Sequence, residues 1–319
     1  MTGYGTREGI LAAKLIAVAN MKGGVGKTAT VVGVAEALAA NAVERTRSIG
    51  AAPQSVLVMD LDAQSSASFA LAGEGRLKEL MSGARTIDAF IAQVLLDGLD
   101  LRLLDYVAPN VSDVTHFGEP LPLSLIAASP HLRSLERGLV HALTRNGLSL
   151  DDVEFHIYQL LSGSLGPVRE RFDYILFDCP PGISTLGEVA IRISDLTIVP
   201  TIPDYLSLLG MDAFSKNVWN EFASANPKLP VPNSLPHVLL SKVRNAGAHK
   251  TRAADLRANV AGGRAGYHAF KTQIPDSLQV PKALERTDVH PDYARKWGDE
   301  LTTHFSDLVL EIDQELGVR

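Results

Sequence analysis

Short runs of apolar and β-branched residues alternate with longer amphipathic stretches along most of the chain. The runs occupy residues 15–19, 55–59, 123–127, 173–177, 196–199 and 237–240, and polar residues, glycine or proline bound each one. Their length and hydrophobicity predict strands that are buried on both faces of a sheet. Between them apolar residues recur at helical spacing, as at Val31, Ala35 and Leu38. This alternation predicts an α/β fold with a doubly wound, mostly parallel sheet flanked by helices.

Two segments depart from this alternation. Residues 73–122 are less regular and include a loop-rich stretch, so we interpret them as an insertion or lid within one domain that spans residues 1–319. Residues 293–316 carry a single apolar stripe from Trp297 to Leu316, which predicts a C-terminal helix docked on the core. Its acidic residues are expected mostly on the polar face, which disfavours a membrane surface. They are Asp299, Glu300, Asp307, Glu311, Asp313 and Glu315.

Composition narrows the class of protein. The chain has 319 residues, of which 46% are hydrophobic, and a formal net charge of −6. It has no apolar run near the roughly 18 residues of a membrane span and no secretory signal, so we expect a cytoplasmic protein without a membrane partner. The single cysteine, Cys179, excludes a disulfide within the chain, and we expect it to serve in packing. The nine histidines show no metal-binding spacing.

The segment after the first predicted strand carries the clearest chemistry. It leads directly into a predicted helix and reads Met21-Lys22-Gly23-Gly24-Val25-Gly26-Lys27-Thr28. Glycines let backbone N–H groups converge on a phosphate, and a helix N-terminus adds a favourable dipole. We therefore expect residues 22–28 to bind ATP, with Lys27 between the β- and γ-phosphates and the Thr28 hydroxyl in the shell of Mg²⁺.

Aspartates follow two other predicted strands. Asp60 and Asp62 come after the second strand, and Asp178 follows the strand at residues 173–177. The carboxyl ends of parallel strands share one edge of the sheet, so these side chains should lie near the phosphate loop. We expect Asp178 to hold Mg²⁺ through a water molecule, and Asp60 to support either the metal shell or loop donors. An alternative is that Asp60 and Asp62 cap the next helix.

The phosphate loop departs from the usual pattern. Met21 replaces its first glycine, and Lys22 is added at the head of the loop. The arrangement Lys-Gly-Gly-x-Gly-Lys-Thr resembles the deviant Walker A signature of P-loop ATPases that include ParA, MinD and the nitrogenase iron protein. From residue 15 to about residue 283 the chain resembles the ParA family of DNA-partitioning ATPases. That resemblance implies a nucleotide-sandwich homodimer in which Lys22 reaches the partner's phosphates, so that Lys22 and Lys27 both act in catalysis.

Three more segments carry the resemblance. Residues 60–64 are similar to the family's Asp-x-Asp-Pro-Gln segment, with Ala63 in place of proline, which implies that Asp62 positions or activates the attacking water. Residues 199–210 resemble the segment that opens the helix at the dimer interface. Gln273-Ile274-Pro275-Asp276 resembles a loop whose proline packs on adenine, which implies that Pro275 contacts the base.

Basic residues concentrate near the C-terminal third of the chain. Residues 242–271 contain one acid, Asp255, and seven basic residues: Lys242, Arg244, Lys250, Arg252, Arg257, Arg264 and Lys271. Such segregation favours sequence-independent, salt-sensitive binding of DNA phosphates, although a solvated basic face is the alternative. The family resemblance favours DNA, and we assign Lys242, Arg244, Lys250, Arg252 and Arg257 to this contact.

The resemblance implies a working cycle for a Mg²⁺-dependent ATPase. ATP would close the dimer, the dimer would hold nonspecific DNA, and a ParB-like adaptor would trigger hydrolysis. The cycle would partition or position a plasmid, a chromosome locus or another cargo along the nucleoid. The alternative is a MinD-like, membrane-associated regulator of the division site. An electron-transfer ATPase like the nitrogenase iron protein would need more bridging cysteines than Cys179 supplies.

Overall fold

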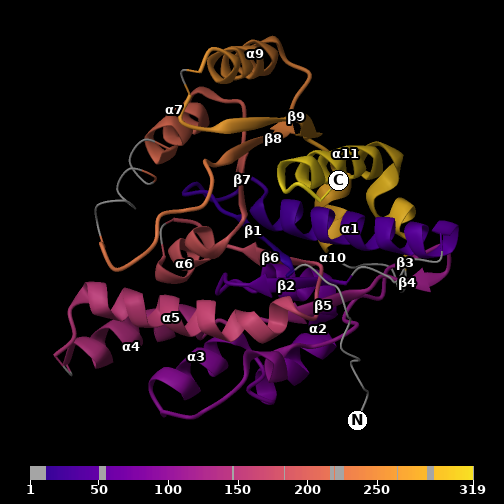
Figure 1. The fold of residues 1–319 in the computed structure, drawn as a ribbon. Helices are drawn as coiled ribbons and strands as arrows, with labels where there is room; N and C mark the ends of the chain where they lie inside the picture. Colours follow the sequence, from indigo (N-terminus) through magenta and orange to yellow (C-terminus); the bar gives the residue numbers. More distant parts are fainter. Residues whose placement is uncertain are drawn as a thin grey trace.

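A seven-stranded parallel sheet forms the centre of the molecule (Figure 1). The computed structural model describes residues 12–49, 55–145, 147–182, 184–215, 219, 226–263, 265–285 and 291–318. The strand order is β5-β2-β6-β1-β7-β8-β9, and every neighbouring pair is parallel. The strands are β1 (Lys14–Val18), β2 (Val56–Asp60), β5 (Leu123–Ile126), β6 (Tyr174–Asp178), β7 (Leu196–Thr201), β8 (His237–Val243) and β9 (His268–Pro275). The predicted fold class is confirmed.

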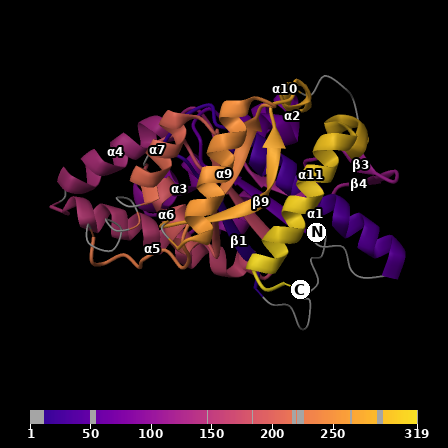
Figure 2. The ribbon, with the colours of Figure 1, turned by 90° about the horizontal axis from the view of Figure 1, so that it is seen from above.

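Helices cover both faces of the sheet because successive strand residues point to opposite sides. In β1, Ile16 and Val18 enter one core cluster, and Leu15 and Ala17 enter the other. The first cluster is covered by α1 (Lys27–Ile49), α2 (Ser66–Ser82), α10 (Gln279–Glu285) and α11 (Tyr293–Glu315). The second is covered by α3 (Ile87–Leu95), η1 (Leu103–Tyr106), α4 (Leu132–Arg145), α5 (Leu150–Arg169), α6 (Thr185–Ile193), α7 (Tyr205–Ala213) and α9 (Gly247–Ala261). Figure 2 shows α9, β9, α11 and α1 side by side.

Each of the six predicted strands overlaps an observed strand, but β9 was not predicted. The interpretation of residues 273–275 as loop is wrong, because they are the last residues of β9. This strand lies at the sheet edge, where Phe270 and Ile274 are buried while Lys271 is exposed. An edge strand needs no continuous apolar run, so its hydrophobic signal is weak.

The irregular segment over residues 73–122 contributes to both core clusters. It contains the second half of α2, which breaks at Gly73, as well as α3 and η1. Leu77 packs in one cluster, and Phe90 and Tyr106 pack in the other. A two-stranded hairpin that was not predicted, β3 (Thr115–His116) and β4 (Glu119–Pro120), completes the segment. Its role as an insertion or lid stays a prediction.

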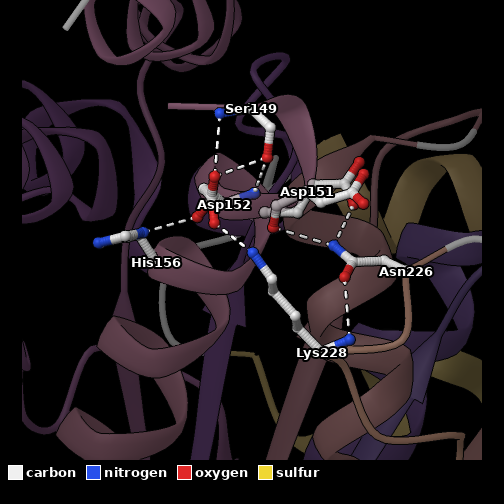
Figure 3. A network of polar contacts seen from close by, with 7 residues as sticks. Ser149, Asp151, Asp152, His156, Asn226 and Lys228 are labelled. Atoms are coloured by element: carbon white, nitrogen blue, oxygen red, sulfur yellow. Dashed lines mark hydrogen bonds and ion pairs between the residues drawn. The ribbon is translucent and has the colours of Figure 1, made fainter. Parts of the chain in front are cut away.

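The chain between α7 and β8 is attached to α5 by a polar network (Figure 3). A capping box between Ser149 and Asp152 begins α5. The Nδ2 of Asn226 donates to the carbonyl of Asp151 at 3.0 Å, and Lys228 forms an ion pair with Asp152. Because Asn226 is buried, this contact fixes the approach of the chain to β8.

The C-terminal helix α11 lies along α1. Its predicted apolar stripe is buried, and the helix is interrupted at Gly298, where φ is 74°. The expectation that Asp313 belongs to the polar face is wrong, because this side chain is buried and accepts a hydrogen bond from the Tyr174 hydroxyl at 2.6 Å. A partner on β6 compensates the burial of this carboxylate, which helical spacing alone does not reveal.

A buried ion pair joins α1 to α11. The ammonium of Lys296 lies 2.6 Å from Glu36 Oε1, and the indole N–H of Trp297 donates to Glu36 Oε2 at 2.7 Å. Both charged side chains are at most 5% exposed. Since α1 starts at the phosphate loop, this pair fixes the helix that carries the loop.

This pair predicts an asymmetric response to substitution. Glu36→Gln leaves the buried Lys296 ammonium without a countercharge, so the free energy of unfolding should fall by about 3 kcal/mol. Adding Lys296→Met should recover most of the loss, because the unpaired charge is then removed. Urea unfolding followed by circular dichroism measures both effects.

The exposed pair between Glu74 and Lys78 on α2 supplies the control. Glu74→Gln should keep the wild-type unfolding midpoint, because exposed helical pairs contribute little. Equal losses in Glu36→Gln and Glu74→Gln would contradict the assignment.

Candidate functional site

The loop between β1 and α1 is shaped for an anionic ligand. Gly24 and Gly26 have φ values of 74° and 94°, a region that side chains rarely adopt, and no atom lies within 4 Å of a Cβ built at Gly24. The helix α1 begins at Lys27, so its first N–H groups point out of the helix without intrahelical acceptors. A cavity of about 420 Å³ opens there, lined by Gly23, Gly26, Lys27, Thr28, Asp62 and Pro275, among others.

Lys27 lies inside the loop rather than in solvent. Its ammonium donates to the carbonyl oxygens of Asn20 at 3.2 Å and Lys22 at 3.1 Å. Burial lowers the pKa of Lys27, while the charges of Asp178 and Asp62 oppose that shift. The cation therefore faces the cavity with two carboxylates near it and with weak, neutral acceptors that a phosphate can replace.

Asp178 ends β6 directly opposite Asp60 of β2, as their strand register requires. The Thr28 hydroxyl donates to Asp178 Oδ2 at 2.8 Å. The other carboxylate oxygen of Asp178, Oδ1, is buried and has no hydrogen-bond partner among the described residues. Burial raises the pKa of Asp178, and the charge of Asp60 adds to the rise. A buried carboxylate oxygen that lacks a donor is suited to a cation, so the residues present fit Mg²⁺.

Asp60 and Asp62 have different surroundings. Asp60 is fully buried, and it accepts hydrogen bonds from the Ser68 hydroxyl at 2.7 Å and from the backbone N–H groups of Ser68 and Asp62. Burial raises its pKa to about 6. Asp62 is half-buried, lines the cavity, and accepts a hydrogen bond from the Gln64 N–H at 2.9 Å. Asp60 thus organises the first turn of α2, and Asp62 is the carboxylate that reaches the cavity.

Cys179 follows Asp178 and is buried in the second core cluster. Burial raises the pKa of its thiol, so the reactive thiolate is disfavoured. Two residues later, Pro181 lines the cavity beside Gly23. This geometry suits the packing role expected for Cys179.

Lys22 is held at the start of α7. Its ammonium donates to the Ser207 hydroxyl at 2.8 Å and lies 3.5 Å from Asp204, which caps α7. The helix exposes Tyr205, Leu206 and Leu209 to solvent by 65%, 70% and 54%. Adjacent exposed apolar side chains suit a surface that a partner covers, as the resemblance implied for this helix.

Pro275 lines the cavity of about 420 Å³ together with Val280 and Phe305, and its contact with adenine stays a prediction. The proposed DNA-binding residues divide between two places. Lys242 lines this cavity and has a φ of 50°, which is unusual for lysine. A second cavity, of about 360 Å³, is lined by Arg244, Lys250 and Arg257, along with Glu300 and His304.

The remaining basic residues add less to this surface. Arg252 lies on α9 but does not line the second cavity, and Arg264 lies outside the described residues. The structure therefore brings three of the five assigned basic residues together around one cavity, at Arg244, Lys250 and Arg257.

Two residues of the site, Asn20 and Ser241, were not assigned a role from the sequence. Asn20 joins the loop to β7, because its amide donates to the Pro200 carbonyl at 2.8 Å and accepts from the Lys22 N–H at 2.9 Å. The Ser241 hydroxyl donates to the Val25 carbonyl at 2.7 Å. Asn20 follows β1 and Ser241 lies near the end of β8, so a polar residue at a strand's carboxyl end was the available signal.

These features define a P-loop nucleotide site at the carboxyl edge of a doubly wound sheet. A protein-family profile, AAA_31, described as an AAA domain, matches residues 13–231, and the chain belongs to this family. The chromosome partitioning protein ParA of Caulobacter vibrioides is 26% identical over 277 residues, which cover 85% of this chain and 83% of the relative. The predicted resemblance to the ParA family is confirmed.

Solved structures share the fold. The ATP complex of a Cyanothece McdA variant has a TM-score of 0.65 and 17% identity, with 97% of this chain and 98% of that chain covered. A putative plasmid partition protein, BB_S35, from Borrelia burgdorferi B31 bound to AMPPNP has a TM-score of 0.62 and 20% identity, with 95% and 99% covered. Among the residues described for this chain, no helix is both long and apolar enough to cross a membrane.

The buried carboxylate Asp60 predicts a pH dependence of stability. Its folded pKa of about 6 lies above the ordinary 3.8, so the folded state binds this proton more tightly than the unfolded state. The resulting stabilisation is present at low pH and is lost as pH rises through about 6. Between pH 5 and 7 the wild type should lose roughly 1 kcal/mol more than Asp60→Asn.

Urea unfolding of nucleotide-free, EDTA-treated protein at the two pH values measures this difference. Asp255→Asn, at an exposed position on α9, should keep the wild-type dependence. Parallel curves for the wild type and Asp60→Asn would contradict the prediction.

Proposed function

We propose that this chain is a Mg²⁺-dependent ATPase that dimerises around ATP and holds nonspecific DNA in the ATP-bound state. The observation that carries the proposal is a glycine-rich loop that lines one cavity together with Lys27 and Thr28. The Thr28 hydroxyl joins this cavity to Asp178, whose other oxygen has no hydrogen-bond partner among the described residues. The AAA domain family of the chain and its resemblance to ParA support it, as does the ATP bound to the structurally similar McdA variant.

In this proposal residues 22–28 hold the triphosphate. The N–H groups of the loop and of the first turn of α1 donate to phosphate oxygens, and Lys27 exchanges its carbonyl partners for the β- and γ-phosphates. The base lies toward Pro275, where Val280 and Phe305 supply apolar surface in the same cavity. The cavity volume of about 420 Å³ is within the usual range for small-molecule sites.

Thr28 and Asp178 would hold Mg²⁺ together with the phosphates. The described residues contain no group of three or more Asp, Glu, His or Cys side chains placed to bind a metal by themselves. Mg²⁺ often keeps waters and phosphate oxygens as ligands, so a shared site of this kind is expected. When bound, the ion neutralises phosphate charge. Asp60 does not need to contact the ion: it accepts hydrogen bonds from the N–H groups of Asp62 and Ser68, and so positions Asp62 and the start of α2.

Hydrolysis is assigned to Asp62, Lys27 and Lys22. Asp62 lines the cavity, which supports its proposed role in orienting the attacking water. Lys22 acts across the homodimer, for which it leaves Asp204 and Ser207 and meets the partner's phosphates. Exchange of an exposed carboxylate for a triphosphate is electrostatically favourable, and it makes dimer closure depend on ATP.

The DNA contact is assigned to Lys242, Arg244, Lys250, Arg252 and Arg257. In the ATP-bound dimer two copies of this surface act together, and a ParB-like adaptor stimulates hydrolysis to release them. The protein then works in the cytoplasm on the nucleoid, and partitions or positions a plasmid, a chromosome locus or another cargo. The exposed acids Asp299, Glu300, Asp307 and Glu315 on α11 disfavour a membrane-bound alternative.

Asp62→Ala separates binding from hydrolysis. The variant should bind ATP and form the dimer, because the phosphate loop is intact, but hydrolysis should slow by on the order of 100-fold as the water loses its orienting carboxylate. Phosphate release and gel filtration with ATP measure the two steps. Lys27→Ala is the comparison, since it should lose ATP binding itself. Normal turnover in Asp62→Ala would remove the assignment.

Replacing Arg244, Lys250 and Arg252 together by alanine tests the DNA contact. ATP-dependent affinity for a random-sequence duplex should fall on the order of tenfold or more at moderate salt, and its salt dependence should become less steep. Fluorescence anisotropy at several salt concentrations measures both, and sedimentation with anionic liposomes tests the membrane alternative.

A second triple variant controls for net charge. Arg133, Arg137 and Arg145 are exposed on α4, which lies apart from α9 in both views (Figures 1 and 2). Their replacement by alanine removes the same charge and should leave DNA affinity much closer to the wild type. Equal losses in the two variants would show that net charge, and not this surface, governs binding.

A further inference from the structure

The cavity beside the phosphate loop, here called the nucleotide cavity, shares a thin wall with the second cavity. The second cavity is lined by Arg244, Lys250 and Arg257 and is called the basic cavity. The wall consists of the ends of β8 and β9, residues 241–244 and 273–276. Lys242 and Asp276 line the nucleotide cavity, Arg244 and Gln273 line the basic cavity, and Pro275 lines both. A ligand in one cavity therefore contacts residues that are only a few positions along the chain from residues lining the other cavity.

One hydrogen bond joins this wall to the phosphate loop, and another joins the two strand ends of the wall. The Ser241 hydroxyl donates to the Val25 carbonyl at 2.7 Å, and the N–H of Asp276 donates to the Val243 carbonyl at 3.0 Å. Lys242 between them holds a left-handed backbone conformation that lysine rarely adopts. Such strain persists only where the surroundings impose it, so the path from the loop to Arg244 is short and constrained.

One ion pair spans the wall. Arg244 Nε lies 2.7 Å from Asp276 Oδ2, and the side chains are 71% and 35% exposed. Asp276 lines the nucleotide cavity, whereas its partner Arg244 lines the basic cavity. Exposed pairs of this kind are weak, so a competing donor or a competing anion can separate them.

We propose that Asp276 is a shared carboxylate that couples the two sites. Without nucleotide it holds Arg244 and masks the guanidinium from DNA phosphates. Bound ATP supplies hydroxyl and amino donors that compete for the same carboxylate, and Arg244 becomes free to bind a phosphate. This inference rests on the proposed function and adds a route by which nucleotide binding controls DNA affinity.

The coupling works in both directions. When a DNA phosphate binds Arg244, Asp276 loses its cation and can accept hydrogen bonds from the nucleotide. DNA should therefore raise the affinity for ATP by the same factor by which ATP raises the affinity for DNA. Each subunit contributes only a modest factor, because the ion pair is exposed. In a dimer the factors from the two subunits multiply.

Asp276→Asn tests the proposal. DNA affinity of the nucleotide-free variant should rise about threefold above the wild type, and the gain produced by ATP should shrink by a similar factor. Anisotropy titrations of a labelled random-sequence duplex at low salt, with and without ATP, measure both. Asp255→Asn removes the same charge from exposed α9, outside both cavities, and should leave the ATP-induced gain at the wild-type value.

An Arg244→Gln background completes a double-mutant cycle. If Asp276 acts by masking Arg244, Asp276→Asn should have no further effect on nucleotide-free DNA affinity in this background. Equal effects of Asp276→Asn and Asp255→Asn would overturn the proposal, as would an effect that persists without Arg244. If wild-type protein with ATP fails to bind DNA, the proposed function falls as well. If it binds and Asp276→Asn keeps the wild-type ATP-induced gain, only the coupling falls.

Discussion

Two carboxylates that face each other on adjacent strands, Asp60 and Asp178, impose the main constraint on this structure. Both are buried, so each needs a hydrogen-bond donor or a cation to stabilise its charge. Asp60 obtains donors from the first turn of α2, while among the described residues Asp178 has the Thr28 hydroxyl on one oxygen and no donor on the other. The fold thus supplies donors to Asp60, whereas one oxygen of Asp178 has a geometry that suits a cation.

The scaffold around these carboxylates is arranged to keep the phosphate loop in place. The loop is joined to β7 through Asn20 and to β8 through Ser241, and the helix that follows it is anchored to α11 by the buried pair of Glu36 and Lys296. Buried, paired groups of this kind give a loop a definite geometry. The residues that must move in the proposed cycle, Lys22 and Arg244, by contrast form ion pairs with partly exposed carboxylates.

This contrast between buried and exposed contacts suggests a general organisation for the molecule. In the loop itself, glycines with positive φ and the first N–H groups of α1 already surround the cavity. In the proposed cycle the changes fall on two partly exposed carboxylates, Asp204 and Asp276, which release Lys22 and Arg244 to other phosphates. Under that proposal, electrostatic exchange between carboxylate and phosphate connects the nucleotide, the second subunit and DNA.

Elements with a local signal could be predicted from the amino-acid sequence. Six sheet strands followed from continuous apolar runs, and the phosphate loop followed from consecutive residues because strand, loop and helix N-terminus are contiguous in the chain. The edge strand β9 could not be predicted in this way, because it buries residues on one face only and therefore has no continuous apolar run. Contacts between residues far apart in the chain depend on the folded arrangement: Glu36 with Lys296, Tyr174 with Asp313, Lys22 with Asp204, and Arg244 with Asp276. Residue type and spacing show which groups are polar or charged. Only the packing of strands and helices determines which partner each group contacts and how far the pair is buried from water.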